Sequence, residues 1–300
     1  MRFADVIGNT DVARALVSMA DSGRVAHAML MYENEGCGAL ALALAYVQYL
    51  NCAHPVDGDS CGECPSCRQM AKLIHPDVHF VFPVNKGPKT SDDKPTSESY
   101  IRYWRELALA NPYFAEADLQ RAIGIESKNG LIAVAEAKFI INTLSLTSVA
   151  DGYKAVILYL PEKMNQETAN RLLKMVEEPP EKTLFIFITH SPEKVLQTIF
   201  SRCQSIRVMP LTKEEAAKVK ALNPFDDSEE YDRFMDLFSD TMRAVTAGDL
   251  QSALECGEIA AALESREKQK AFCTFAARCI RKIFMLQQNM PQIADVMEQE

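Results

Sequence analysis

The stretch from residue 28 to residue 50, AMLMYENEGCGALALALAYVQYL, constrains the fold of this chain more than any other part of it. Residues 29–32 form a short apolar run that predicts a buried strand, residues 33–38 a glycine-containing loop, and residues 40–50 an apolar helix. A strand, a glycine loop and a helix in this order have the layout of a phosphate cradle. Taken alone, the same residues also fit an apolar helix that merely follows a turn.

The chemistry of a working cradle is missing from this stretch. The working motif is Gly-x-x-x-x-Gly-Lys-Ser/Thr, in which backbone N–H groups surround the phosphates, the lysine reaches the terminal ones and the hydroxyl holds magnesium. Glu33 takes the place of the first glycine, while Gly36 and Gly38 remain in the loop. Ala39 replaces the lysine, and Leu40 replaces the hydroxyl residue. We therefore expect a degenerate cradle in which ATP is not bound productively.

Four of the nine cysteines lie within sixteen residues directly after this helix, at Cys52, Cys61, Cys64 and Cys67. Clustered cysteines in a cytosolic chain indicate metal binding rather than disulfides, and four thiolates can close a tetrahedral zinc shell. A closed shell leaves no position for water, so the expected zinc is structural. A set of reduced surface thiols is the alternative. His54 and His75 lie nearby and can substitute for a cysteine.

The remaining chain predicts an α/β core. A fully apolar run such as residues 155–160 is typical of a central strand in a parallel sheet. A working ATPase of this layout would end that strand with two acidic residues that hold magnesium and prime water. Tyr159 and Leu160 stand there instead, and Glu162 follows too late, after a proline. The other expected strands are 78–84, 183–189 and 205–209, and the expected helices are 3–23, 70–74, 132–146, 165–178 and 192–200.

Residues 85–99 are polar, contain two prolines and predict a mobile loop. Residues 100–122 then predict a helix whose Trp104 belongs to the core. The whole chain has a net charge of −9, which argues against a protein that mainly grips the nucleic-acid backbone. It has no run of about 18 apolar residues and no signal-peptide pattern at its start, so we expect a cytoplasmic protein without a membrane partner.

Six motifs together resemble one family, the bacterial clamp-loader subunits of DNA polymerase III, which are of the AAA+ class. The motifs are FADVIGN at 3–9, HAML at 27–30, Cys52-x8-Cys-x2-Cys-x2-Cys, HPD at 75–77, ANRLLKMVEEPPE at 169–181 and SRC at 201–203. The resemblance covers about residues 3–210. It implies an α/β fold, an AAA+ parallel sheet core flanked by helices, with an inserted four-cysteine zinc module and a C-terminal all-α region.

Within that family the gamma subunit hydrolyses ATP, whereas delta prime members typically lack a functional cradle. Ala39, Leu40, Tyr159 and Leu160 are similar to the delta prime pattern. The resemblance then implies a non-catalytic subunit that works with gamma/tau and delta, and through the complex with the sliding clamp and primed DNA. It also implies that Arg202, in the SRC motif, reaches a neighbour's ATP in trans. The alternatives are a gamma/tau-like ATPase with an unorthodox cradle and a zinc-dependent DNA-binding module.

The resemblance also implies a division into domains. Residues 1–210 are expected to form the AAA+ core, with the zinc module within 52–67 and an insertion at about 85–122. Residues 211–228 are expected to be an abbreviated lid or linker. Residues 229–300 are expected to be a helical collar-like domain with helices at 231–244, 250–263 and 267–288. Lid and collar are both shorter than in the family, so we expect a truncated collar.

Overall fold

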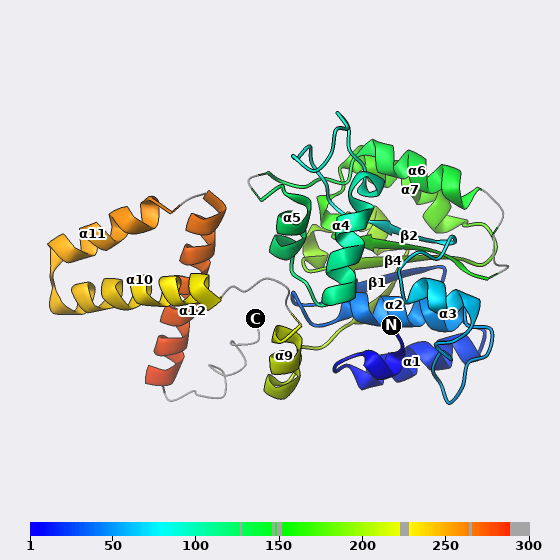
Figure 1. Cartoon of the computed structure of the whole chain (residues 1–300), viewed down its shortest axis with the longest axis horizontal. Helices are drawn as coiled ribbons and strands as arrows, with labels where there is room; N and C mark the ends of the chain where they lie inside the picture. Colours follow the sequence, from blue (N-terminus) through cyan, green and yellow to red (C-terminus); the bar gives the residue numbers. More distant parts are fainter. Residues whose placement is uncertain (127, 146–147, 149–151, 223–227, 264–265, 289–300) are drawn as a thin grey trace. The chain divides into compact units, whose positions relative to one another are not determined.

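The structure of the 300-residue chain is a computed structural model that describes residues 1–126, 128–145, 148, 152–222, 228–263 and 266–288 (Figure 1). It contains two compact units, Met1–Pro224 and Phe225–Glu300. The end of the predicted helix 132–146, part of the linker 211–228 and the last residues of the collar-like region lie outside the described residues.

The first unit is built on a five-stranded parallel sheet with the order β2-β3-β4-β1-β5. Residues along β3 and β4 are buried throughout, which explains their unbroken apolar sequences. Because the strands are parallel, the carboxyl ends of β1, β3 and β4 meet at one edge of the sheet, where α/β folds place their sites. The strands are β1 Ala28–Tyr32, β2 Val78–Val81, β3 Lys154–Tyr159, β4 Thr183–Thr189 and β5 Gln204–Arg207.

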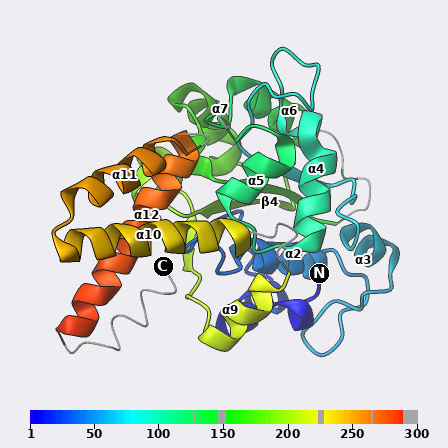
Figure 2. The same cartoon turned by 60° about the vertical axis from the view of Figure 1, so that its left-hand side comes forward.

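Helices cover both faces of this sheet. Helices α6 (Val134–Leu144) and α7 (Gln166–Glu177) lie on one face, and α1 (Thr10–Asp21) and α2 (Ala39–Leu50) lie on the other (Figures 1 and 2). The first face buries Leu30, Leu158 and Phe187 of three neighbouring strands against α6 and α7. Helix α2 is apolar all round because it is buried along nearly its whole length. The parallel sheet flanked by helices confirms the predicted fold class.

The segment predicted as one helix at 100–122 is in fact two helices, α4 (Ser97–Ala110) and α5 (Glu116–Ile123). The chain leaves the helical conformation at Asn111, whose φ is −147° and ψ 99°. Pro112 explains the break, because proline disfavours the helical region for the residue before it. Helix α4 also begins earlier than predicted, inside the polar stretch expected to be a loop, where Thr96 and Ser99 cap its first turn.

Several other predicted elements are shorter in the structure. The helix predicted at 70–74 is instead α3 (Pro65–Met70), and the strand predicted at 78–84 ends at Val81, with Val84 in an isolated bridge to Leu131. Only residues 10–21 of the predicted helix 3–23 form an α-helix, preceded by a 3-10 turn. The remaining short elements are η1 Phe3–Asp5, η2 Pro161–Lys163, η3 Pro192–Lys194, α8 Gln197–Phe200 and α9 Lys213–Lys220.

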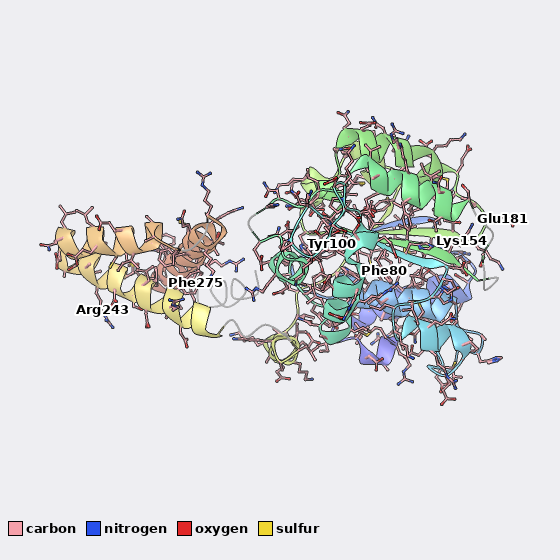
Figure 3. All side chains as sticks on the ribbon, turned by 45° about the horizontal axis from the view of Figure 1, so that its top comes forward. Phe80, Tyr100, Lys154, Glu181, Arg243 and Phe275 are labelled. Carbon is pink, nitrogen blue, oxygen red and sulfur yellow. The ribbon has the colours of Figure 1, made fainter. Side chains whose placement is uncertain are left out.

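The second unit contains three described helices, α10 (Ser228–Ala247), α11 (Leu250–Ala261) and α12 (Arg266–Gln287). Its small core is rich in aromatic rings; Phe234, for example, packs on Phe272 with ring centroids 5.5 Å apart. Figure 3 shows Phe275 among these helices and Arg243 projecting away from them. Among the described helices, none combines the length and apolar character needed to cross a membrane.

Candidate functional site

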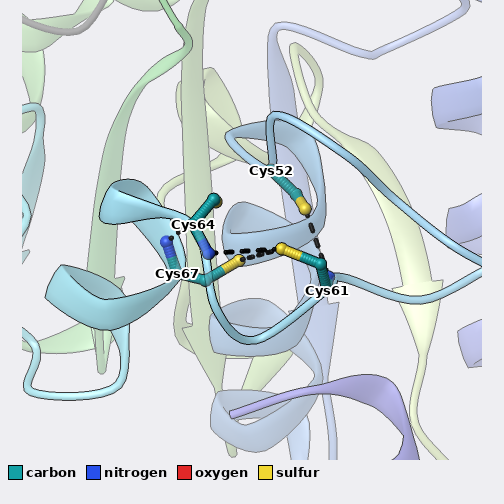
Figure 4. Close-up of side chains that lie close together, drawn as sticks. All are labelled: Cys52, Cys61, Cys64 and Cys67. Atoms are coloured by element: carbon teal, nitrogen blue, oxygen red, sulfur yellow. Dashed lines mark hydrogen bonds between the residues drawn. The ribbon is translucent and has the colours of Figure 1, made fainter.

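The four predicted cysteines converge on one point. Their sulfur atoms all lie within 4.8 Å of one another, with Cys61 Sγ 3.9 Å from Cys67 Sγ. Cys52 lies just after α2, Cys61 lies in the following loop, and Cys64 caps the N-terminus of α3, whose first turn carries Cys67 (Figure 4). Pro65 at the first position of α3 pre-sets the backbone for this knuckle.

The backbone around the cluster is arranged for thiolates. The N–H groups of Cys61, Cys64 and Cys67 donate to the sulfurs of Cys52, Cys61 and Cys64 at 3.2, 3.4 and 3.5 Å. Donation from the N–H groups of Cys64 and Glu63 lowers the pKa of the Cys61 thiol to about 6, whereas burial raises the pKa of the Cys52 and Cys67 thiols. Four sulfur donors with N–H support fit a tetrahedral zinc ion.

The histidines considered as substitute ligands do not belong to this group. Within the described residues the metal-capable cluster consists of the four cysteines alone. His75 is buried, and its Nδ1 accepts a hydrogen bond from the backbone N–H of Asp77 at 3.2 Å, so it caps the turn before β2. Asp59, between the first two cysteines, accepts the backbone N–H groups of Phe3 and Ala4 at 2.9 Å each and ties the module to the N-terminal segment.

The glycine loop joins the end of β1 to the start of α2, the strand–loop–helix order expected from the sequence. It leaves β1, passes Gly36 and Gly38, both with positive φ of 84° and 106°, and enters α2. The carboxylate of Glu33 turns back into the loop, where its Oε2 accepts the backbone N–H of Ala39 at 2.7 Å. Phosphate groups bind to N–H groups at such helix N-termini. The N–H group of Ala39 at this helix N-terminus is therefore already bonded to a carboxylate of the chain itself.

A buried histidine accompanies this carboxylate. His190 directly follows β4, and its Nε2 lies 3.5 Å from Glu33 Oε1 while its Nδ1 lies 3.8 Å from Glu35 Oε1. Burial lowers the pKa of His190, but the hydrogen bond and charge of Glu33, with Glu35 and Glu162, outweigh it, so the pKa is raised. Glu33 and Glu35 thus favour the protonated form of the buried His190.

The strand end that carries the acidic pair in an ATPase is apolar here. Tyr159 is buried at the end of β3 and donates its hydroxyl to the carbonyl of Phe114 at 3.2 Å. Leu160, also buried, has a positive φ of 60° and turns the chain into η2. Glu162 lies at this edge, but its Oε2 accepts the hydroxyl of Thr189 at 2.8 Å. Its pKa is raised by burial.

Arg202 lies far from this edge of the sheet. It precedes β5, whose first residue, Gln204, is in register with Met29 at the start of β1. The glycine loop begins at Glu33, four residues after Met29. At ~3.3 Å per residue, the start of β5 next to Arg202 and the start of the glycine loop are therefore about 13 Å apart along the strands. Arg202 pairs with the carboxylate of Glu177 and donates to the carbonyl of Thr198 at 2.8 Å.

Sequence reasoning missed two residues of the cradle. His190 had a usable signal, because it is a titratable residue directly after a buried strand that ends in the polar Thr189. Tyr113, whose ring lies over Gly38, had none, because it lies between α4 and α5, distant in sequence from the loop. The residues predicted for the degenerate cradle, in contrast, do lie together: Glu33, Gly36, Gly38, Ala39 and Leu40.

Comparison with protein families gives one match over most of the chain. The family model described as "DNA polymerase III, delta subunit" matches residues 8–212. A DNA polymerase III subunit delta' from Yersinia pestis is 32% identical over 192 residues, which are 63% of this chain and 44% of that protein. The corresponding protein from Pseudomonas aeruginosa is 30% identical over 178 residues, which are 59% of this chain and 42% of that protein.

A second branch also matches. A DNA polymerase III subunit gamma/tau from Mycobacterium tuberculosis H37Rv is 30% identical over 200 residues, 67% of this chain and 27% of the relative. The chain therefore spans less than half the length of these curated relatives. Among solved structures, a gamma subunit-related protein from Thermotoga maritima has a TM-score of 0.38 at 15% identity, covering 88% of this chain and 77% of that one.

Proposed function

Since the chain belongs to the DNA polymerase III, delta subunit family, we propose that it is a non-catalytic, delta prime-like subunit of a bacterial clamp loader. Its expected partners are the gamma/tau and delta subunits and, through the complex, the sliding clamp and primed DNA. A cytoplasmic location follows from that role. Gamma/tau relatives match this chain as well. The choice between a delta prime-like and a gamma/tau-like subunit therefore rests on the residues of the glycine loop and of the end of β3.

The observation that carries the choice is the bond between Glu33 and Ala39. A carboxylate held on the first N–H of α2 repels phosphate at the place where phosphate would have to bind. Ala39 offers no ammonium and Leu40 no hydroxyl for magnesium. Tyr159 replaces a magnesium-binding carboxylate at the end of β3. These four substitutions act at one site, and together they favour a subunit that does not hydrolyse ATP.

We assign structural zinc to Cys52, Cys61, Cys64 and Cys67, since four converging sulfurs close the coordination shell. The ion would fasten the loop after α2 to α3. Asp59 in turn would hold the N-terminal segment against this module. The zinc supplies folding energy to the module and no reaction step.

We assign Arg202 to a neighbour's ATP, as an arginine finger in trans. Its place near the amino end of β5 keeps it away from its own cradle. Its side chain is 34% exposed, and its pairing with the half-exposed Glu177 is of the kind that contributes little to stability. Exchanging that carboxylate for a phosphate therefore costs little.

We divide the chain into three parts. Residues 1–210 form the AAA+ core, 211–228 a lid or linker that includes α9, and 229–300 the collar-like helices α10 to α12. In the described part of that last region, exposed apolar side chains such as Leu250 and Leu254 suit a collar that packs on other subunits.

Two experiments test this function. Titration of the purified chain with MgATP should give no binding isotherm, and the preparation should hydrolyse no ATP. Turnover that disappears when Gly38 is substituted would instead identify a gamma/tau-like ATPase. Co-purification with the gamma/tau and delta subunits tests the assignment to the loader, and failure to associate with either subunit would contradict it.

A further inference from the structure

The linker between α4 and α5, residues 111–115, lies across the degenerate cradle. Tyr113 is 5% exposed, and its ring packs so closely on the glycine loop that a Cβ on Gly38 would lie 2.6 Å from it. A Cβ on Gly36 would lie 3.4 Å from the Tyr113 carbonyl oxygen. The linker therefore covers Gly38 with the Tyr113 ring and contacts the half-buried Gly36 through the Tyr113 carbonyl.

The same tyrosine also holds the N-terminal segment. Its hydroxyl accepts the backbone N–H of Ile7 at 2.6 Å and donates to the carbonyl of Ile7 at 3.3 Å. Burial raises the pKa of Tyr113 to about 12, so the phenol stays neutral and keeps both hydrogen bonds at neutral pH. One side chain thus joins the segment before α1 to the loop before α2.

The residue after Tyr113 reaches the end of β3. The ring of Phe114 packs on Tyr159 with centroids 5.2 Å apart, and the Phe114 carbonyl accepts the Tyr159 hydroxyl. Tyr159 in turn meets His190 edge-on at 5.4 Å. The linker is therefore continuous with the buried group that includes Glu33.

Glu116 makes two further polar contacts, one with the glycine loop and one with η2. The backbone N–H of Glu116 donates to Glu35 of the glycine loop at 2.6 Å. The Glu116 carboxylate pairs with Lys163 of η2 at 2.9 Å, and both side chains are about two-thirds buried or more. Residues 111–116, which are the linker and the first residue of α5, thus contact the N-terminal segment, the glycine loop and the ends of β3 and η2, which all border the same edge of the sheet.

We propose that residues 111–116 are an intramolecular occupant of the degenerate cradle, which fixes the glycine loop and the N-terminal segment without a nucleotide. The proposal rests on the proposed function, because an occupied cradle is useful only in a subunit that binds no ATP. It assigns a structural role to the predicted insertion at about 85–122, a role that the sequence alone did not indicate. Helices α4 and α5 serve as the scaffold that presents Tyr113 and Phe114 to the site.

Hydrogen exchange of backbone amides tests this occupant in the full chain. Tyr113→Ala should accelerate exchange at Ile7 and at residues 36–40 by at least about tenfold, because the contacts that hold these amides closed are removed. Tyr103→Ala is the matched control, since Tyr103 lies on α4 of the same insertion and contacts Lys89 instead. Exchange at residues 36–40 that is the same in both variants would overturn the proposal.

A milder variant covers the case in which Tyr113→Ala fails to fold. Tyr113→Phe removes only the hydroxyl, so exchange at Ile7 should rise roughly fivefold while residues 36–40 keep their protection under the ring. Unaltered exchange at Ile7 would contradict the assigned contact. MgATP should leave exchange of the wild-type protein unchanged. Protection by MgATP would overturn both the occupant and the proposed function, whereas a failure confined to the Tyr113 variants overturns the occupant alone.

Discussion

Glu33 and Ala39 are joined by a 2.7 Å hydrogen bond from the backbone N–H of Ala39 to the carboxylate of Glu33, across the glycine loop. The bond satisfies an N–H group at the N-terminus of α2 that has no partner within the helix. It also puts a negative charge where the helix dipole favours one. The loop is therefore complete without an external anion.

We predict that Glu33→Ala lowers the free energy of unfolding by about 1–2 kcal/mol, the range for loss of a capping carboxylate at a helix N-terminus. Glu33→Gln should lose less, because its amide oxygen can still accept the N–H of Ala39. Urea unfolding monitored by circular dichroism measures both values. Glu35→Gln changes a half-exposed carboxylate of the same loop and serves as the control. Its free energy of unfolding should stay close to that of the wild type. Equal stability of Glu33→Ala and the wild type would contradict the role of this bond.

A second prediction concerns Glu136 of α6, which holds Ser97 at the start of α4. Its side chain is 1% exposed on α6, and Oε1 accepts the backbone N–H of Ser97 and, at 2.9 Å, the Ser97 hydroxyl. Burial raises its pKa from 4.5 to about 7. A raised pKa in the folded state means that the native protein binds this proton more tightly than the unfolded chain.

The sign of the pH dependence follows. The stabilisation from Glu136 is fully present below pH 4.5 and is lost as the pH rises through about 7. The shift corresponds to about 3 kcal/mol at 1.36 kcal/mol per pKa unit. Glu136→Gln should therefore remove a fall in stability between about pH 4.5 and 7, which unfolding curves in a pH series would reveal. A wild type and a variant whose stabilities change in parallel over this range would contradict the assignment.

The sequence was sufficient for those parts of the fold whose signals are local. The unbroken apolar runs of β3 and β4 and the spacing of the four cysteines specify those elements without reference to distant residues. The break between α4 and α5 had a local signal as well, Pro112, which the helical apolar pattern on either side obscured.

Long-range contacts explain what could not be predicted. The contact between Tyr113 and Gly38 depends on the packing of α4 against the core, where Trp104 stacks on Phe80 with ring centroids 4.3 Å apart. The pairing of Arg202 with Glu177 similarly depends on how α7 and α8 pack. Neither arrangement is encoded in the spacing of a motif, because each depends on how separate elements pack against one another.

A third prediction concerns the cysteine cluster. The purified, reduced protein should contain about one equivalent of zinc, and Cys64→Ser should lose most of it, because three thiolates do not close the shell. Amides of residues 52–70 should then exchange faster while β3 and β4 keep their protection. Cys273→Ser, at an exposed cysteine of the second unit, is the matched control and should retain the metal. Well under one equivalent of zinc in the wild type would contradict the assignment.

The last prediction concerns Arg202 in a reconstituted loader. A guanidinium supplied in trans stabilises the charge that spreads over the transferring phosphoryl group, and such fingers contribute about 10³–10⁵ in rate. Arg202→Ala should leave assembly intact, since its pair with Glu177 is partly exposed, while the partner's clamp- and DNA-stimulated ATP hydrolysis falls at least several-fold. Arg202→Lys should not restore it, because an ammonium lacks the planar fork.

Two controls separate this role from a structural one. Arg171→Ala removes an exposed arginine that pairs with Glu167 within α7, and it should leave hydrolysis unchanged. Glu177→Gln weakens the local partner of Arg202 without touching the guanidinium, so hydrolysis should persist or rise because the finger is released. If Arg202 were only a structural residue, Glu177→Gln and Arg202→Ala would have similar effects on the loader. A fall in hydrolysis with Arg202→Ala but not with Glu177→Gln, with assembly intact in both variants, is therefore the result that identifies the finger.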